Sequence, residues 1–264
     1  YDARQQGSVL HNVLQRFFVE RVEAGGARLS ANDADAARAR IRELALEELT
    51  RYDAVLALHG EVIAGALHRE TVRMCEAFVD GEVALKQKEK VALVPTHFEF
   101  TFGQSDDEGG PAIERPLTIE TDDIRVQLRG RIDRIDTAAT DEGLRIDVVD
   151  YKRSPTSVKR GVENGTHLQL PVYMMAAQRL LFADRETVPG EGMLRDLRHP
   201  GKAPKTKLDA ETLDLVEENI VHDVAFIRAG HFPPPAESCS SAYCPFKTIC
   251  RCHDDRIARK EQAD

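Results

Sequence analysis

The hydrophobic positions of this chain follow two periods, and each predicts a different kind of element. Apolar residues recur every three to four positions after Ser8, which predicts a helix N-capped by Ser8 and ended by Gly25 and Gly26. The same period predicts helices over residues 34–52, 62–78, 166–182 and 208–229. Strand patterns, alternating or rich in β-branched residues, occupy residues 91–102, 124–132, 144–152 and 192–197. The chain therefore mixes helices and strands along its length.

The most informative of these patterns predicts a β-hairpin within residues 130–153. A polar turn containing glycine, residues 138–143, separates its two strands. In the second strand every other side chain lies on one face, so an apolar stripe leads directly to Asp150 and Lys152. A carboxylate and an ammonium are costly on a buried face unless they are paired or bind a metal.

The order of the predicted elements indicates an α/β fold, with a mixed central sheet flanked by helices and a helical insertion at about residues 30–90. A length of 264 residues with 42% hydrophobic residues suffices for one domain, and we expect residues 1–264 to form one. Because the chain starts at Tyr1, we expect it to be a fragment of a longer protein. The absence of a long apolar run or signal peptide predicts a cytoplasmic protein with no membrane partner.

Asp133 lies on the strand before the turn, where the hairpin can bring it near Asp150. Two carboxylates and a lysine at strand ends suit a hard divalent cation and an attacking water. The alternative is a surface hairpin with a weak Asp–Lys ion pair. Strict alternation places Asp133 with Arg129 and Arg131 on the polar face, and a bulge at Gly130 would re-aim it.

The net charge of −9 argues against a protein that only coats DNA, but it is compatible with an enzyme that has a local basic groove. Lys152 and Arg153, with Lys159 and Arg160, flank the predicted site and are expected to contact phosphate. A second basic segment, residues 195–207, is interpreted equally well as solvated loops or as a DNA contact.

The combination of G-x-x-D-R-x-D with a hydrophobic strand ending in D-Y-K resembles the PD-(D/E)XK nuclease superfamily, specifically its RecB/AddB-type exonuclease domains. Two further pieces resemble that family: Gly7 and His11 match its G-x-x-x-H helix, and Gln169 and Tyr173 match its Q-x-x-x-Y helix. Glu99 stands where similar domains carry a glutamate, although a solvent-facing strand residue is the simpler interpretation.

Four of the five cysteines lie within fourteen residues near the C-terminus, which favours metal ligation over a disulfide framework; they are Cys239, Cys244, Cys250 and Cys252. The fifth, Cys75, is expected to be a small buried hydrophobic residue. The C-terminal motif resembles the iron–sulfur staple of AddB-type nucleases, which implies a 4Fe–4S cluster held by Cys239, Cys244 and Cys250. Four residues separate Cys239 from Cys244, where two are usual in the family. The family's cysteine before the first helix is also absent. The cluster would therefore be incomplete or missing unless Cys252 or Cys75 replaces that upstream cysteine. Zinc bound by these cysteines and His253 is the competing interpretation.

The resemblance implies metal-dependent hydrolysis of DNA phosphodiesters without sequence specificity, as an exonuclease module of a helicase–nuclease protein in DNA repair or recombination. Mg²⁺ or Mn²⁺ would be held by Asp133, Asp150, His11 and the carbonyl of Tyr151. Lys152 would orient water and stabilise charge, supported by Gln169 and Tyr173. Since the chain has no Walker A motif, the implied partners are DNA and a separate helicase domain or subunit. The alternative is a nuclease-like DNA-binding or scaffolding module that does not cleave; the presence of all the matched residues argues against it.

Overall fold

A computed structural model describes residues 3–56, 61–106, 110–153 and 158–231 of this chain. The chain forms two compact units, residues 1–221 and 222–264. The four C-terminal cysteines lie outside the described residues, so the iron–sulfur and zinc interpretations both remain predictions. Among the described residues, no helix combines the length and apolarity needed to cross a membrane.

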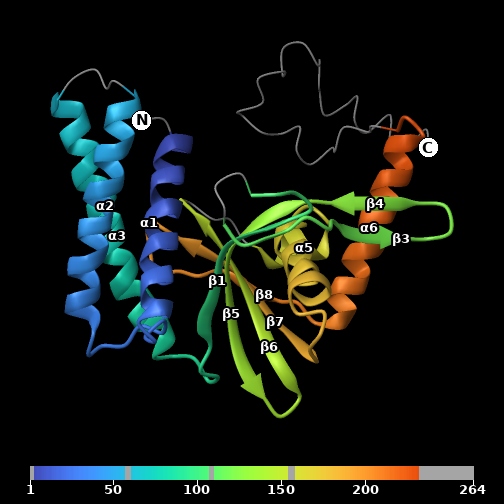
Figure 1. The fold of residues 1–264 in the computed structure, drawn as a ribbon. Helices are drawn as coiled ribbons and strands as arrows, with labels where there is room; N and C mark the ends of the chain where they lie inside the picture. The colour runs from blue at the N-terminus through green and yellow to red at the C-terminus, as the bar shows by residue number, and fades with distance from the viewer. Residues whose placement is uncertain (1–2, 57–60, 107–109, 154–157, 232–264) are drawn as a thin grey trace, which may run out of the picture. The chain divides into compact units, whose positions relative to one another are not determined.

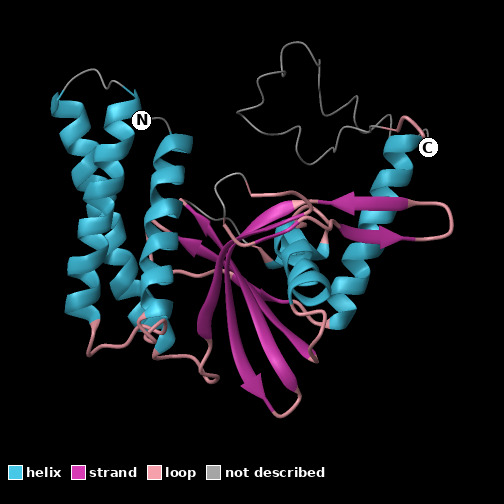
Figure 2. Ribbon diagram, in the orientation of Figure 1, coloured by secondary structure: helices cyan, strands magenta, loops and turns pink. Residues whose placement is uncertain are grey.

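A six-stranded mixed sheet forms the centre of the first unit (Figures 1 and 2). Its strands, in spatial order, are β2 (Ala112–Ile113), β1 (Val94–Phe102), β5 (Gly130–Thr140), β6 (Gly143–Lys152), β7 (Thr187–Asp196) and β8 (Lys205–Lys207). β5 and β6 pair antiparallel through the turn at residues 140–143, which confirms the predicted hairpin. β6 and β7 pair in parallel, and the helices between them cross one face of the sheet.

Helices cover both faces of this sheet (Figure 1). On one face lie α1 (Ala3–Glu23), α2 (Ala34–Leu56) and α3 (Glu61–Lys86), and their apolar stripes pack against Phe98, Val149 and Tyr151. The other face is covered by α4 (Lys159–Glu163), α5 (Gln169–Ala176), the π-helical turn η1 (Ala177–Leu181) and the first part of α6 (Ala210–Arg228). The predicted α/β class is confirmed, and α2 and α3 form the predicted helical insertion.

Two predictions about individual segments were wrong. α1 begins at Ala3, so Ser8 lies inside the helix and does not cap it. The strand predicted over residues 124–132 divides: β4 (Arg125–Leu128) pairs with β3 (Leu117–Glu120) in a separate two-stranded sheet, and β5 starts at Gly130. A Cβ atom at Gly130 would lie 3.0 Å from the ring of Phe102, so glycine lets the chain pass close to β1 at this division. In the second basic segment Arg195 is only 1% exposed and cannot contact DNA, while for its other residues the two interpretations remain predictions.

Cys75 is 1% exposed in the core shared by α1–α3 and the sheet, as its helical pattern predicts. Burial raises the pKa of its thiol to about 12, so the thiol stays protonated at neutral pH. Cys75 therefore acts as a small apolar side chain, and a buried protonated thiol is a poor metal ligand.

Candidate active site

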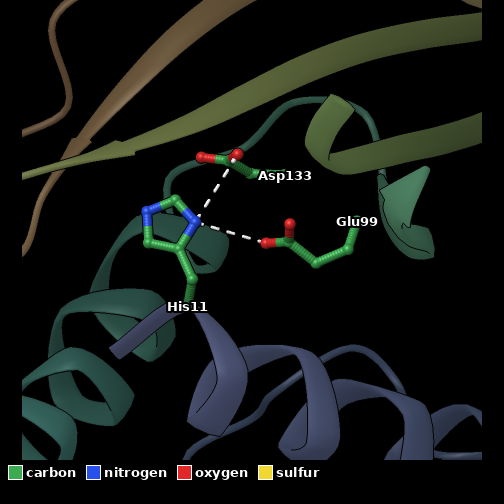
Figure 3. Close-up of side chains that lie close together, drawn as sticks. All are labelled: His11, Glu99 and Asp133. Carbon is green, nitrogen blue, oxygen red and sulfur yellow. Dashed lines mark hydrogen bonds and ion pairs between the residues drawn. The ribbon is translucent and has the colours of Figure 1, made fainter. Parts of the chain in front are cut away.

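Three side chains from distant parts of the sequence meet where α1 crosses the sheet (Figure 3). His11 comes from α1, Glu99 from β1 and Asp133 from β5. Nδ1 of His11 lies 3.2 Å from Oε1 of Glu99 and 3.6 Å from Oδ1 of Asp133. One ligand atom from each residue lies within 4.8 Å of the others. An imidazole nitrogen with two carboxylates is a donor set that suits a divalent cation.

Glu99 and Asp133 lie at a break in the alternation of their two strands. Phe98 pairs with Arg134 and faces α1–α3, whereas Phe100 pairs with Ile132 and faces the opposite core. Residues two positions apart in a regular strand share a face, so the alternation changes between these two pairs. Glu99 at this point has a φ of 48°, a left-handed conformation that costs about 1–3 kcal/mol away from glycine. The break lies at Asp133 itself, so Asp133 does not need a bulge at Gly130 to leave the polar face.

Lys152 and Asp150 lie together at the end of β6, as the hairpin predicts. Nζ of Lys152 is 2.7 Å from Oδ2 of Asp150. Gln169 donates from Nε2 to the other carboxylate oxygen of Asp150 and to the hydroxyl of Tyr173, both at 2.8 Å. The Q-x-x-x-Y pair was expected to support Lys152, but the hydrogen bonds of Gln169 reach it only through Asp150.

Tyr151 contributes to the site through its main chain. Its backbone N–H donates to Oδ2 of Asp133 at 2.7 Å, which holds the carboxylate towards His11. The phenol side chain is buried on the α1–α3 face, edge-on to the His11 ring at 5.6 Å between centroids. Ligation by the Tyr151 carbonyl remains a prediction.

A cleft of about 350 Å³ opens beside these groups, and His11, Glu99, Arg131 and Lys152 are among the residues that line it. Arg131 places its guanidinium 3.8 Å from Glu99 and 3.9 Å from Asp106, and its side chain is 45% exposed. A partly exposed arginine in this position is suited to bind a phosphate that enters the cleft. Arg131 was not among the predicted site residues, although strand alternation places it on the face of Asp133.

Comparisons with known proteins show the family of this chain. The family model described as the PD-(D/E)XK nuclease superfamily matches residues 1–251. The chain belongs to the PD-(D/E)XK nuclease superfamily.

Relatives of this PD-(D/E)XK chain include three proteins that are each named as one subunit of an ATP-dependent helicase/deoxyribonuclease. The protein of Desulforudis audaxviator is 37% identical over 109 residues, which is 40% of this chain and 9% of that protein. For Lacticaseibacillus casei the identity is 28% over 211 residues, 78% of this chain and 17% of the relative. For Staphylococcus aureus it is 28% over 176 residues, 64% of this chain and 14% of the relative. The matched regions therefore span less than a fifth of each relative.

The acidic groups of this PD-(D/E)XK site are buried close together, which changes how they ionise. Burial, reinforced by the charges of Asp150 and Glu99, raises the pKa of Asp133 to about 7 against the opposing effect of His11. Burial alone would lower the pKa of His11, but its hydrogen bond to Glu99 and the charge of Asp133 raise it to about 9. Burial also raises the pKa of Asp150, opposed by Lys152. At neutral pH the metal-free site therefore holds a proton on His11.

We expect the apparent Mn²⁺ affinity of the protein to rise between pH 6 and pH 9. His11 must lose its proton before it can bind a metal, and below pH 7 Asp133 must also lose one. Each released proton makes the affinity rise by up to roughly tenfold per pH unit. Calorimetric titration with Mn²⁺ in buffers of different ionisation enthalpy measures both the affinity and the protons released. An affinity that stays constant from pH 6 to pH 8.5 would contradict this protonation scheme.

Proposed function

We propose that this chain is a nuclease module that hydrolyses DNA phosphodiester bonds with Mg²⁺ or Mn²⁺. The observation that carries the proposal is the convergence of His11, Glu99 and Asp133 within 4.8 Å, beside the Asp150–Lys152 pair. Glu99, Asp133 and Asp150 are 7%, 7% and 1% exposed. Three buried carboxylates in one place repel one another, and a divalent cation offsets that repulsion.

In this proposal His11, Glu99 and Asp133 hold the metal, with Asp150 and the Tyr151 carbonyl as further ligands. When bound, the metal polarises the scissile phosphate and lowers the pKa of a bound water. Lys152 orients the attacking water and stabilises the charge that develops on the phosphate. Gln169 holds the Asp150 carboxylate in place through its hydrogen bond. Arg131 binds a neighbouring phosphate across the cleft.

We infer DNA as the substrate because the relatives are named as deoxyribonuclease subunits. Contacts through Arg131 and Lys152 would be to phosphates, which carry no sequence information, so cleavage would be independent of sequence. The names of these relatives also include a helicase. We therefore infer that the partner is a helicase domain or subunit, which supplies an unwound DNA strand. We propose that the chain acts as an exonuclease in DNA repair or recombination.

The test is digestion of linear DNA labelled at one end, with Mg²⁺, with Mn²⁺ and with EDTA. Covalently closed single-stranded circles serve as a second substrate, because an exonuclease needs an end and an endonuclease does not. Metal-dependent release of the label from linear DNA alone supports the proposal in full. If the folded protein binds DNA yet cleaves neither substrate with either metal, the chain is the non-cleaving DNA-binding module.

An iron–sulfur cluster at Cys239, Cys244 and Cys250 is a separate part of the proposal and is supported by the sequence motif alone. Protein purified without oxygen is expected to be brown and to contain iron and sulfide, and Cys250→Ser should bleach it. Colourless anaerobic protein that carries one equivalent of zinc would establish the zinc interpretation.

A further inference from the structure

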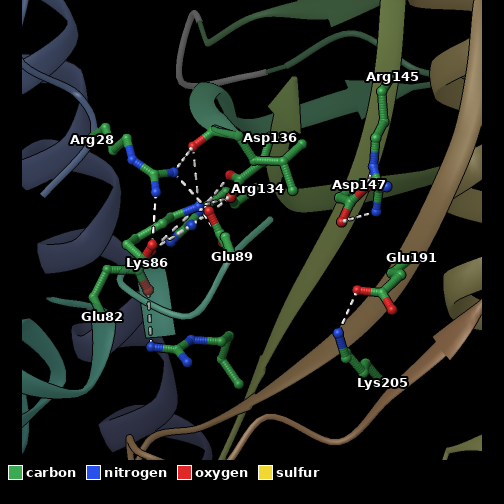
Figure 4. A network of polar contacts seen from close by, with 12 residues as sticks. Arg28, Glu82, Lys86, Glu89, Arg134, Asp136, Arg145, Asp147, Glu191 and Lys205 are labelled. Carbon is green, nitrogen blue, oxygen red and sulfur yellow. Dashed lines mark hydrogen bonds and ion pairs between the residues drawn. The ribbon is translucent and has the colours of Figure 1, made fainter. Parts of the chain in front are cut away.

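A second group of charged side chains is buried between α3 and the sheet, apart from the metal ligands (Figure 4). α3 contributes two of them and the sheet three; this buried ionic cluster consists of Glu82, Lys86, Arg134, Asp136 and Arg195. Each of the five residues is at most 4% exposed. No role in the proposed chemistry accounts for so many charges inside a core.

Glu82 bridges two strands of the sheet from α3. Its Oε1 lies 2.7 Å from Nη2 of Arg134 on β5, and its Oε2 lies 2.9 Å from Nη2 of Arg195 on β7. One turn further along α3, Nζ of Lys86 lies 2.9 Å from Oδ2 of Asp136. Arg134 also donates to both carboxylate oxygens of Asp136, at 2.5 and 2.6 Å. Hydrogen bonds of Glu82 and Lys86 therefore join α3 to β5, and an ion pair joins α3 to β7.

Buried ion pairs of this kind contribute little to stability, because the cost of removing charges from water offsets their attraction. What they can supply is a unique register between packed elements. Besides the contacts of His11 with Glu99 and Asp133, the core between α1–α3 and the sheet is apolar, and apolar burial has no directional preference. The buried ionic cluster thus supplies directional contacts that apolar packing lacks, at a distance from His11.

Three of the proposed metal ligands, His11, Glu99 and Asp133, are closely connected to this cluster. Asp133 immediately precedes Arg134 on β5. The guanidinium of Arg134 lies 4.8 Å over the ring of Phe18, which is two helical turns from His11 on α1. Phe18 in turn stacks on Phe98, the residue before Glu99, at 5.3 Å between ring centroids. A shift of the helical layer would therefore move His11 away from Glu99 and Asp133.

We propose that the buried ionic cluster positions the metal ligands by fixing the register of α1–α3 against the sheet. The inference rests on the proposed metal site. Glu82, Lys86, Arg134, Asp136 and Arg195 act as positioning residues, and none of them touches the metal or the DNA. Their effect reaches the site through the placement of His11 and of the Tyr151 N–H that holds Asp133.

The test compares Glu82→Gln with Asp147→Asn. Asp147 is also 1% exposed and paired, but its partner Arg145 lies on the same strand, so this pair joins no helix to the sheet. Glu82→Gln is expected to weaken Mn²⁺ binding by at least roughly tenfold, the size seen when groups that orient metal ligands are removed. Asp147→Asn should leave the affinity within about twofold of the parent.

A metal-free measurement accompanies the titration. Hydrogen exchange of the Tyr151 amide should accelerate in Glu82→Gln relative to other β6 amides, and it should not do so in Asp147→Asn. If the two variants weaken Mn²⁺ binding equally, or Glu82→Gln keeps the parent affinity and Tyr151 protection, the positioning role is wrong. A parent protein that binds no Mn²⁺ would refute the proposed function; the Tyr151 exchange would then still decide whether the cluster orders β6 at this point.

Because Glu82→Gln leaves two arginines without their shared carboxylate, it could fail to fold. A double variant, Glu82→Met with Arg195→Met, removes one negative and one positive charge together and leaves the net charge of the cluster unchanged. Apolar replacement of a whole buried pair is usually tolerated. This variant is expected to fold and still to bind Mn²⁺ at least roughly tenfold more weakly than the parent. A folded double variant with the parent affinity would overturn the inference.

Discussion

Replacing Lys152 with alanine is expected to lower metal-dependent DNA cleavage by roughly 10²–10³-fold, the usual loss when one group that stabilises transition-state charge is removed. Nζ of Lys152 lies at the end of β6 beside Asp150 and borders the cleft. Its side chain is 41% exposed, so little packing is lost and the fold should remain intact. The rate of label release from linear DNA at saturating Mn²⁺ measures the effect.

The matched control is Lys159→Ala. Lys159 lies seven residues further along the chain, is 73% exposed and pairs only loosely with Glu163, at 3.8 Å. At saturating DNA this variant should cleave at close to the parent rate, because a phosphate contact by one exposed cation adds only to the general attraction to DNA. Lys152→Ala should also keep the Mn²⁺ affinity, since an ammonium is no metal ligand. Cleavage by Lys152→Ala at the parent rate would contradict the mechanism.

The hairpin that carries Asp133, Asp150 and Lys152 could be predicted from the sequence because its signals are local. Strand periodicity, a polar turn and the D-Y-K ending all lie within residues 130–153. His11 was predicted from the apolar stripe of α1 together with the family motif, and the structure places it 3.6 Å from Asp133. Local patterns and motif spacing were sufficient for these residues.

The solvent-facing interpretation of Glu99 was wrong because its environment depends on pairing between distant segments. A glutamate in an alternating strand is usually exposed, but Glu99 is 7% exposed and lies at a break in both β1 and β5. Its positive φ is atypical for a non-glycine residue, and no propensity signals it. Sites that combine strain and buried charge are where local patterns are expected to fail.

The buried ionic cluster was missed for a related reason. Alternation assigns charged strand residues to solvent, yet Arg134 and Arg195 are 2% and 1% exposed because both meet Glu82. Glu82 and Arg134 are 52 residues apart in sequence, and nothing local links them. Hydrophobic periodicity cannot distinguish a charge in water from a charge paired inside a core.

Asp133→Asn is expected to lower cleavage by at least roughly 10²-fold and yet to stabilise the metal-free protein. Asp133 contributes to the proposed metal site from a buried position, so its loss should sharply weaken Mn²⁺ binding. In the metal-free protein its charge is unfavourable, since burial raises its pKa to about 7. An asparagine keeps an oxygen that can accept the Tyr151 N–H without carrying that charge.

The difference in stability between Asp133→Asn and the parent should depend on pH. An unfolded aspartate ionises near pH 3.9, whereas folded Asp133 ionises near pH 7. Between these values the folded state binds more protons than the unfolded state, so the parent loses stability as pH rises. The stability gained by the variant should therefore grow from pH 4 to pH 7, reaching at least about 1.4 kcal/mol, the equivalent of one pKa unit. Urea unfolding in EDTA measures it, and saturating Mn²⁺ should reverse the order by stabilising only the parent.

Asp136→Asn, three residues along the same strand, is the control with the opposite sign. Burial alone would raise the pKa of Asp136, but the charges of Arg134 and Lys86 hold it below its usual range. The Asp136 carboxylate stabilises the protein at pH values above its pKa in the unfolded chain. This stabilisation is lost as the pH falls through the pKa of Asp136 in the folded protein. Removing it leaves two buried cations without that partner, at a cost of roughly 3–5 kcal/mol. If both asparagine variants destabilise the metal-free protein equally, the carboxylates at His11 are not held in an unfavourable charged arrangement, and the physical case for a cation there fails.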